Sequence, residues 1–135
     1  MLKVTKLINS TSKITFTNQT LNRFYTTKVT ANDFEKLVLK SDKPVILDVY
    51  ADWCGPCRMI AGPLAKAVDS KNGSMILYKL DFDESPSIAE KYNVMSIPHV
   101  FAFHKGEIID QFIGAIPEPR INQFLDNVQK KVNTK

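Results

Sequence analysis

The sequence predicts an α/β domain over residues 26–135, with a central mixed sheet and helices on both faces. Short runs of Val, Ile, Leu and Phe alternate with segments in which apolar residues recur every three or four positions. These strand-like and helix-like segments follow the order βαβαβαββα, which implies a mixed sheet covered on both sides. Of the 135 residues, 44% are hydrophobic, which is enough for one core without a metal or a structural disulfide.

The first half of the domain opens with a short β-favouring run over 26–29. Thr30 is a good helix N-cap, and Asp33 can reach back to it as a capping partner. Residues 45–50 are nearly all apolar, which is typical of a central strand buried on both faces. A helix is expected from about Pro56. The apolar positions expected to be buried are Phe34, Leu37 and Val38 in the first helix, and Met59, Ile60, Leu64 and Val68 in the second.

The second half begins after a turn at Asn72-Gly73. Ser85 and Pro86 can cap and open a short helix, because proline is favoured at the first helical position. Lys105-Gly106 separates two β-favouring runs, so those runs predict an antiparallel hairpin. The expected elements are a strand over 75–82, a helix from 86 to about 92, hairpin strands over 100–104 and 108–113, and a helix over 117–132.

Residues 1–25 differ in composition from the rest of the chain. They hold no acidic residue and are rich in Ser, Thr and Asn, which is typical of an organelle transit peptide. The stretch 23–26 (Arg-Phe-Tyr-Thr) resembles a mitochondrial processing site, with cleavage after Tyr25. The sequence therefore predicts a mitochondrial transit peptide over 1–25 and a location in the matrix. A basic tail on a cytoplasmic protein is the alternative. The basic residues concerned are Lys3, Lys6, Lys13 and Arg23.

The net charge of +4 is concentrated in this leading segment. Removal of its four basic residues from the total of 18 leaves 14, which equals the number of acidic residues. The positive charge is therefore poor evidence for nucleic-acid binding, and none is expected. No apolar run approaches the roughly 20 residues of a membrane span, so no membrane association is expected either.

Cys54 and Cys57 are the two cysteines of the chain, and they stand where a strand ends and a helix begins. A bridge between them would close a very short loop, which constrains the unfolded chain little, so the spacing indicates redox turnover. Backbone N–H groups and the helix dipole at Cys54 favour a thiolate that attacks a substrate disulfide. Cys57, one turn further on, would resolve the mixed disulfide. Gly55 and Pro56 shape the turn between the two cysteines and so tune the redox potential of the cysteine pair.

The chain resembles the thioredoxin family from about Thr26 to its C-terminus. The resemblance is carried by Trp-Cys-Gly-Pro-Cys at 53–57, by Asp48 in the preceding strand, and by Ile97-Pro98 before a late hairpin. It implies a thioredoxin fold and a protein disulfide reductase that serves in electron transport and cell redox homeostasis.

The resemblance also implies how the dithiol is regenerated. A flavin- and NADPH-dependent thioredoxin reductase would supply the electrons, so NADPH is used indirectly and the chain binds no cofactor or metal of its own. The chain carries no nucleotide-binding glycine fingerprint. The implied partners are that reductase and disulfide-containing proteins such as peroxiredoxins, and the implied state is a monomer.

Asp48 is the most informative residue outside the cysteine motif. A charged carboxylate in an apolar strand is costly, so its pKa should be raised, and the resemblance implies that it accepts the proton of Cys57. Lys79 matches the family's partner for that acid. Pro98 matches the family's cis-proline, whose backbone offers hydrogen bonds to a bound peptide. The residues that match the family's apolar docking patch are Trp53, Gly55, Pro56, Ile97, Ile113, Gly114 and Ala115.

Three positions depart from the family pattern. Tyr50 stands where the family usually has Trp, and Pro63 comes one position later than the usual helix proline, which predicts a shifted kink. His99 follows Pro98 where Thr is common. Its imidazole would either perturb the thiols or be a tolerated substitution within a strand.

Three other functions are compatible with parts of the sequence. The first is a zinc site, because tetrahedral zinc takes the ligand types of Cys54, Cys57, His99 and His104. However, the Cys-to-His spacer is far longer than the dozen or so residues of a zinc finger. Alternation along a strand would also direct the two histidines to opposite faces. The second is a binding module of the same fold, such as a subunit or a chaperone, in which the cysteines have no catalytic role. A glutaredoxin is the third, although its usual Pro-Tyr is replaced here by Gly55-Pro56.

Overall fold

The computed structural model describes residues 26–134, and its elements follow the order expected from the sequence. The predicted transit peptide over 1–25 lies outside the described residues. Within the described part, no helix is long and apolar enough to cross a membrane. The elements are β1 (Thr27–Val29), η2 (Glu35–Leu39), β2 (Val45–Tyr50), α2 (Gly55–Asp69), β3 (Ile76–Asp81), α3 (Pro86–Lys91), β4 (His99–His104), β5 (Glu107–Ile113) and α4 (Glu118–Asn133).

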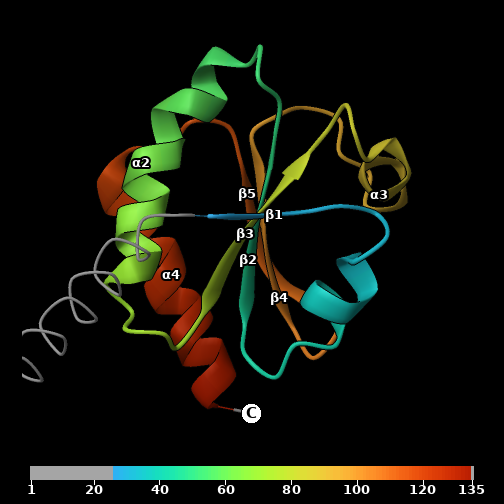
Figure 1. Ribbon diagram of the computed structural model, residues 1–135. Helices are drawn as coiled ribbons and strands as arrows, with labels where there is room; N and C mark the ends of the chain where they lie inside the picture. Colours follow the sequence, from blue (N-terminus) through green and yellow to red (C-terminus); the bar gives the residue numbers. More distant parts are fainter. Residues whose placement is uncertain (1–25, 135) are drawn as a thin grey trace, which may run out of the picture.

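The five strands form one mixed sheet in the order β1-β3-β2-β4-β5. Strands β1, β3 and β2 run parallel, whereas β4 pairs antiparallel with both β2 and β5. Helices α2 and α4 lie on one side of the sheet, and η2 and α3 lie on the other (Figure 1). The mixed α/β architecture predicted from the sequence is confirmed.

Strand β2 lies in the middle of the sheet and separates two core layers. Ile46 points to the layer under α2 and α4, where it belongs to the same cluster as Leu64 and Leu125. Leu47 points to the opposite layer, with Phe34 and Phe101. Residues 45–49 of this strand are all buried, so the nearly continuous apolar run is explained by burial on both faces.

Three local expectations are corrected by the structure. The backbone N–H of Thr30 does bond to Asp33 Oδ1 at 2.6 Å, but the turns that follow form a π-helix and not an α-helix. The hydroxyl of Ser85 makes no capping hydrogen bond to α3, and it is buried without a hydrogen-bond partner among residues 26–134. Met59 is 70% exposed, because its position on α2 points away from the buried stripe that begins at Cys57.

The β4–β5 hairpin holds the segment before β4 against the segment after β5. Lys105 and Gly106 both have positive φ, +53° and +81°, which is the geometry of a type I′ turn that suits a two-residue hairpin. At the other end of the hairpin, the N–H of Gly114 donates to the carbonyl of Pro98 at 2.8 Å. Helix α2 continues through Pro63, which has no N–H to donate to the preceding turn. The expected shift of its kink stays a prediction.

Candidate active site

Cys54 and Cys57 form a disulfide at the point where the chain passes from β2 into α2, with Cα atoms 5.3 Å apart. Cys54 has extended backbone dihedrals and is the N-cap of α2. The N–H of Cys57 donates to Cys54 Sγ at 3.2 Å, so the Cys54 sulfur occupies the place of a capping acceptor. Both cysteines are buried, at 4% and 3% exposure, and Pro56 lies in the first turn between them.

The segment before β4 lies against the disulfide at the same end of the sheet, because Val49 near the end of β2 pairs with His99 at the start of β4. Ile97 packs on the cluster formed by the two cysteines, and its carbonyl oxygen lies 3.8 Å from Cys54 Sγ. The Ile97–Pro98 peptide bond is cis, as the resemblance implied. Because the N–H of Gly114 donates to the carbonyl of Pro98, the structure brings Ile97, Pro98 and Gly114 together at the end of the sheet that carries Cys54.

The surface around the disulfide is apolar and largely exposed. Trp53 is 66% exposed, and its indole N–H donates to Asp83 Oδ2 at 2.8 Å, which holds the ring beside the loop that follows β3. Ile113 is 55% exposed; Pro56 and Ala115 are also exposed, whereas Pro98 is buried.

Met59 and Met95 are two further exposed apolar side chains, and they were not predicted as surface residues. Met95, at 91% exposure, stands two residues before Ile97, and Met59 stands two residues after Cys57. Their neighbours in the sequence could have drawn attention to them. Their exposure could not be read from the sequence, because a methionine is more often buried than exposed.

Asp48 lies on the sheet face covered by α2, and its side chain is nearly inaccessible to water. The residue is 2% exposed, and its Oδ1 atom has no hydrogen-bond partner among the described residues. Burial raises the pKa of this carboxyl from 3.8 to about 6, and the nearby positive charge of Lys79 offsets part of the effect. The raised pKa expected from the apolar strand is therefore present.

Lys79 stands directly beside Asp48 in the β2–β3 register, but the two side chains do not form an ion pair within 4 Å in the described structure. Instead, Lys79 Nζ lies 4.2 Å from the centre of the Tyr50 ring. Lys79 and Tyr50 both border a crevice of about 120 Å³ that reaches Cys57. The other residues that line this crevice are Ala51, Asp52, Arg58 and Ala61.

His99 is 4% exposed and packs within the layer on the opposite side of the sheet from Asp48. Its ring stacks on Phe101 at 4.0 Å, and its Nε2 is hydrogen-bonded to Gln111 Oε1 at 2.8 Å. Since Phe101 belongs to the core under η2 and α3, the imidazole is directed away from the carboxyl that faces α2. Over residues 26–134, no three His, Cys, Asp or Glu side chains form a group that could hold a metal ion.

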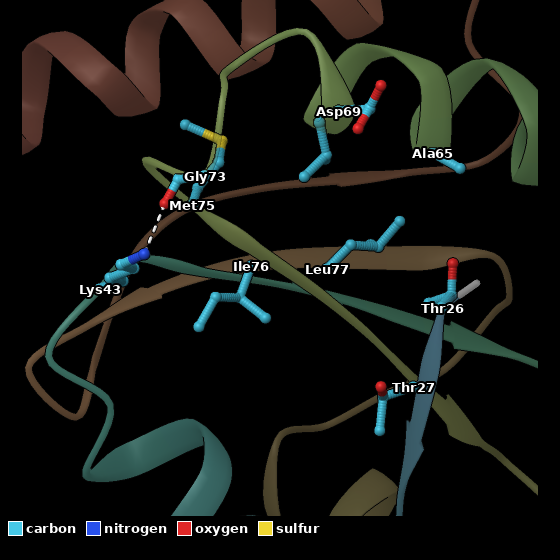
Figure 2. Close-up of a pocket in the computed structure, with 10 residues that line it drawn as sticks. Thr26, Thr27, Lys43, Ala65, Asp69, Gly73, Met75, Ile76 and Leu77 are labelled. Atoms are coloured by element: carbon cyan, nitrogen blue, oxygen red, sulfur yellow. Dashed lines mark hydrogen bonds between the residues drawn. The ribbon is translucent and has the colours of Figure 1, made fainter. Parts of the chain in front are cut away.

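A separate hollow of about 280 Å³ lies at the other end of α2, away from the disulfide (Figure 2). Ala65 and Asp69 border it from the helix, and Leu77 borders it from β3. Lys43 Nζ donates to the carbonyl of Gly73 at its rim, at 2.8 Å. None of the predicted site residues lines this hollow.

A disulfide at a helix N-terminus, beside a cis-proline and after a strand that carries a buried carboxyl, defines a thiol-disulfide oxidoreductase. Comparison with protein-family models matches residues 25–127 to the family described as Thioredoxin. The chain belongs to the thioredoxin family. This confirms the resemblance, the fold and the protein disulfide oxidoreductase activity predicted from the sequence.

The curated relatives include bacterial, mitochondrial and chloroplast proteins. The chain is 46% identical over 90 residues to the thioredoxin of Streptomyces clavuligerus, covering 67% of this chain and 83% of that one. It is 32% identical over 120 residues to the mitochondrial thioredoxin of Bos taurus, covering 83% and 72%. It is 42% identical over 98 residues to the chloroplastic M-type thioredoxin of Pisum sativum, covering 73% and 57%.

Proposed function

We propose that this chain reduces protein disulfides in a fixed order, with Cys54 attacking and Cys57 resolving. The Cys54 thiolate attacks one sulfur of the substrate disulfide, which forms a mixed disulfide and releases the first substrate thiolate. Cys57 then loses its proton and attacks Cys54 Sγ, which forms the intramolecular disulfide and releases the second thiolate. Two electrons pass from the dithiol to the substrate. The observation that carries this order is the hydrogen bond from the Cys57 N–H to Cys54 Sγ, because it favours negative charge on Cys54.

Asp48 is proposed as the acceptor of the Cys57 proton, with Lys79 as its partner. A carboxyl with a pKa of about 6 is mostly ionised at pH 7 to 8, yet it is a stronger base than an ordinary aspartate. Asp48 faces the layer that contains α2, the helix that carries Cys57. Without forming an ion pair, Lys79 supports the charged form of Asp48 through its positive charge on the neighbouring strand.

The exposed apolar surface around the disulfide is proposed to dock substrate proteins. Trp53, Pro56 and Ile113 supply its side chains, and the backbone around Ile97 and Pro98 supplies its polar groups. Disulfide-bonded proteins, peroxiredoxins among them, are the proposed substrates, and the chain is proposed to act as a monomer. Gly55 and Pro56 are proposed to set the redox potential through the turn between the cysteines. Gly114 and Ala115 complete the proposed patch.

A thioredoxin reductase is the proposed electron donor, and NADPH is used through it. Insulin-disulfide reduction by the full chain tests this choice, with either thioredoxin reductase and NADPH or glutathione, glutathione reductase and NADPH. We expect turnover with the first system and only background with the second. A chain carrying Cys54→Ser and Cys57→Ser is the control for both systems. Turnover with glutathione alone would instead assign a glutaredoxin-type cycle.

The mitochondrial matrix is the proposed location, with residues 1–25 as the transit peptide and the cytoplasm as the alternative. The acid-free, basic composition of this segment and the similarity to mitochondrial relatives support the proposal. In import assays with isolated mitochondria, we expect the full chain to become protease-protected and to begin at Thr26. Conversion of Lys3, Lys6, Lys13 and Arg23 to Gln is expected to abolish import. A wild-type chain that stays outside would favour the cytoplasm.

A further inference from the structure

Tyr50 and Lys79 make a contact that the proposed mechanism does not use. The Lys79 ammonium lies over the Tyr50 ring, 4.2 Å from its centre, which is close enough for a cation–π interaction. Tyr50 is half-buried at the end of β2, and its phenol borders the same crevice as Cys57. The contact therefore borders the crevice of the resolving cysteine, and its lysine is paired in register with the proposed proton acceptor.

The same lysine has a second possible partner within reach, the carboxylate of Asp48. Asp48 and Lys79 are directly paired across the parallel strands β2 and β3, and neighbouring strands lie about 4.8 Å apart. The Oδ1 atom of Asp48 is buried without a hydrogen bond from any residue in the described part of the chain, so an ammonium that turned toward it would find an unoccupied acceptor. In the structure this ion pair is not made, and the cation lies over the aromatic face.

We propose that Tyr50 is a positioning residue that holds the Lys79 ammonium over its ring and so keeps it from pairing with Asp48. The proposal deepens the proposed function, because it rests on Asp48 being the group that accepts the Cys57 proton. An Asp48 carboxylate tied to Lys79 would be a weaker base. With the cation held by the ring, the carboxyl keeps its raised pKa, and the positive charge stays in the crevice that Cys57 lines.

The other charged groups near these side chains are already engaged. On the β1 side, Lys28 bonds to Glu84 at 2.9 Å and lies 3.8 Å from Asp81. Lys28, Asp81 and Asp52 are the charges that act on the Tyr50 phenol, and Lys79 is the charge that acts on Asp48. On α2, the Arg58 guanidinium donates to the carbonyl of Asp52 at 2.6 Å. Lys79 is therefore the cation whose position modulates the effect of burial on the Asp48 carboxyl.

A double-mutant cycle in the oxidised full-length protein tests the proposal, because the cysteines do not titrate in that state. The Asp48 carboxyl carbon is followed by NMR against pH in wild type, Tyr50→Leu, Lys79→Met and the double variant. We expect Tyr50→Leu to lower the pKa of Asp48 by about 1 or more, since the freed ammonium would close the ion pair. In the Lys79→Met background, the same change is expected to move this pKa by less than about 0.3.

The conservative variant Tyr50→Phe is the matched control, because it keeps the aromatic face and removes only the hydroxyl. We expect its Asp48 pKa to match that of wild type. An equal shift from Tyr50→Leu with and without Lys79 would overturn the proposal, because it would show that the ring acts only by excluding water. A rise of the pKa in Tyr50→Leu, or no change, would overturn it as well.

A kinetic measurement separates this proposal from the role proposed for Asp48. The rate at which Cys57 resolves a preformed mixed disulfide is measured against pH in wild type, Asp48→Asn and Tyr50→Leu. If Asp48→Asn resolves as fast as wild type, the proposed proton acceptor fails, whereas the NMR cycle still decides whether Tyr50 positions Lys79. If both proposals hold, the acidic limb of the Tyr50→Leu rate profile moves to lower pH together with the Asp48 pKa.

Discussion

Replacing Cys54 with serine is expected to reduce insulin-disulfide reduction to the background rate, a loss of at least about a thousandfold. The attacking group must be a thiolate, and a serine hydroxyl stays protonated at neutral pH. The substitution is nearly isosteric at a residue that is 4% exposed, so the fold should be kept. The measurement is the initial rate with saturating thioredoxin reductase and NADPH, together with a circular dichroism spectrum.

The matched control is Cys57→Ser, which removes the resolving thiol and leaves the attacking one. We expect this variant to accumulate a covalent mixed disulfide with its substrate, seen as a mass that a reductant removes. Trapping by Cys54→Ser in place of Cys57→Ser would reverse the proposed order of the two cysteines. The structure makes this control necessary, because the two residues are almost equally buried, at 4% and 3% exposure.

Replacing Asp48 with asparagine is expected to stabilise the oxidised protein by about 2–3 kcal/mol at pH 8. The folded carboxyl has a pKa of about 6, against 3.8 for an unperturbed one, so the folded state binds more protons in this window. Its contribution to stability is therefore complete below pH 3.8 and is lost as the pH rises through about 6. A difference of about two pKa units corresponds to about 3 kcal/mol. Asparagine carries no charge and avoids this cost.

The measurement is urea unfolding of wild type and Asp48→Asn from pH 3 to pH 8. The two free energies of unfolding should converge near pH 3 and separate as the pH rises. Asp42→Asn, at an exposed loop position, is the matched control and should change stability little at any pH. An Asp48→Asn protein that is less stable than wild type at pH 8 would contradict this prediction, because it would mean that a partner stabilises the Asp48 carboxylate in the folded protein.

The redox pair was predictable because it depends on local chemistry. Two cysteines in consecutive turns at a strand-to-helix junction have few other uses, and both the junction and the N-cap position of Cys54 follow from the pattern of apolar residues. The buried state of Asp48 was predictable for a similar reason, since a strand that is apolar on both sides must lie inside a sheet.

The predictions for the helices were wrong where the spacing of apolar residues did not specify which side of the helix would face the sheet. Met59 fits the helical spacing but points to solvent, because the buried stripe of α2 is set by the sheet below it. The first helix has the expected capping contact at Thr30, but its backbone is π-helical where an α-helix was predicted. In this conformation Phe34 and Val38 pack in the core on that side of the sheet. Local propensity is weak compared with such packing.

By itself, the sequence determined the order of strands and helices, the redox pair and the burial of Asp48, because each depends on residues that are close along the chain. Only the tertiary structure decided which side chains meet across strands. It directs His99 toward Gln111 and Phe101, away from the face that carries Asp48. It also places Lys79 over Tyr50, although the register sets that lysine beside Asp48. Alternation along a strand selects a face, but the partner of a long flexible side chain is selected by competing charges and rings that only the folded sheet brings together.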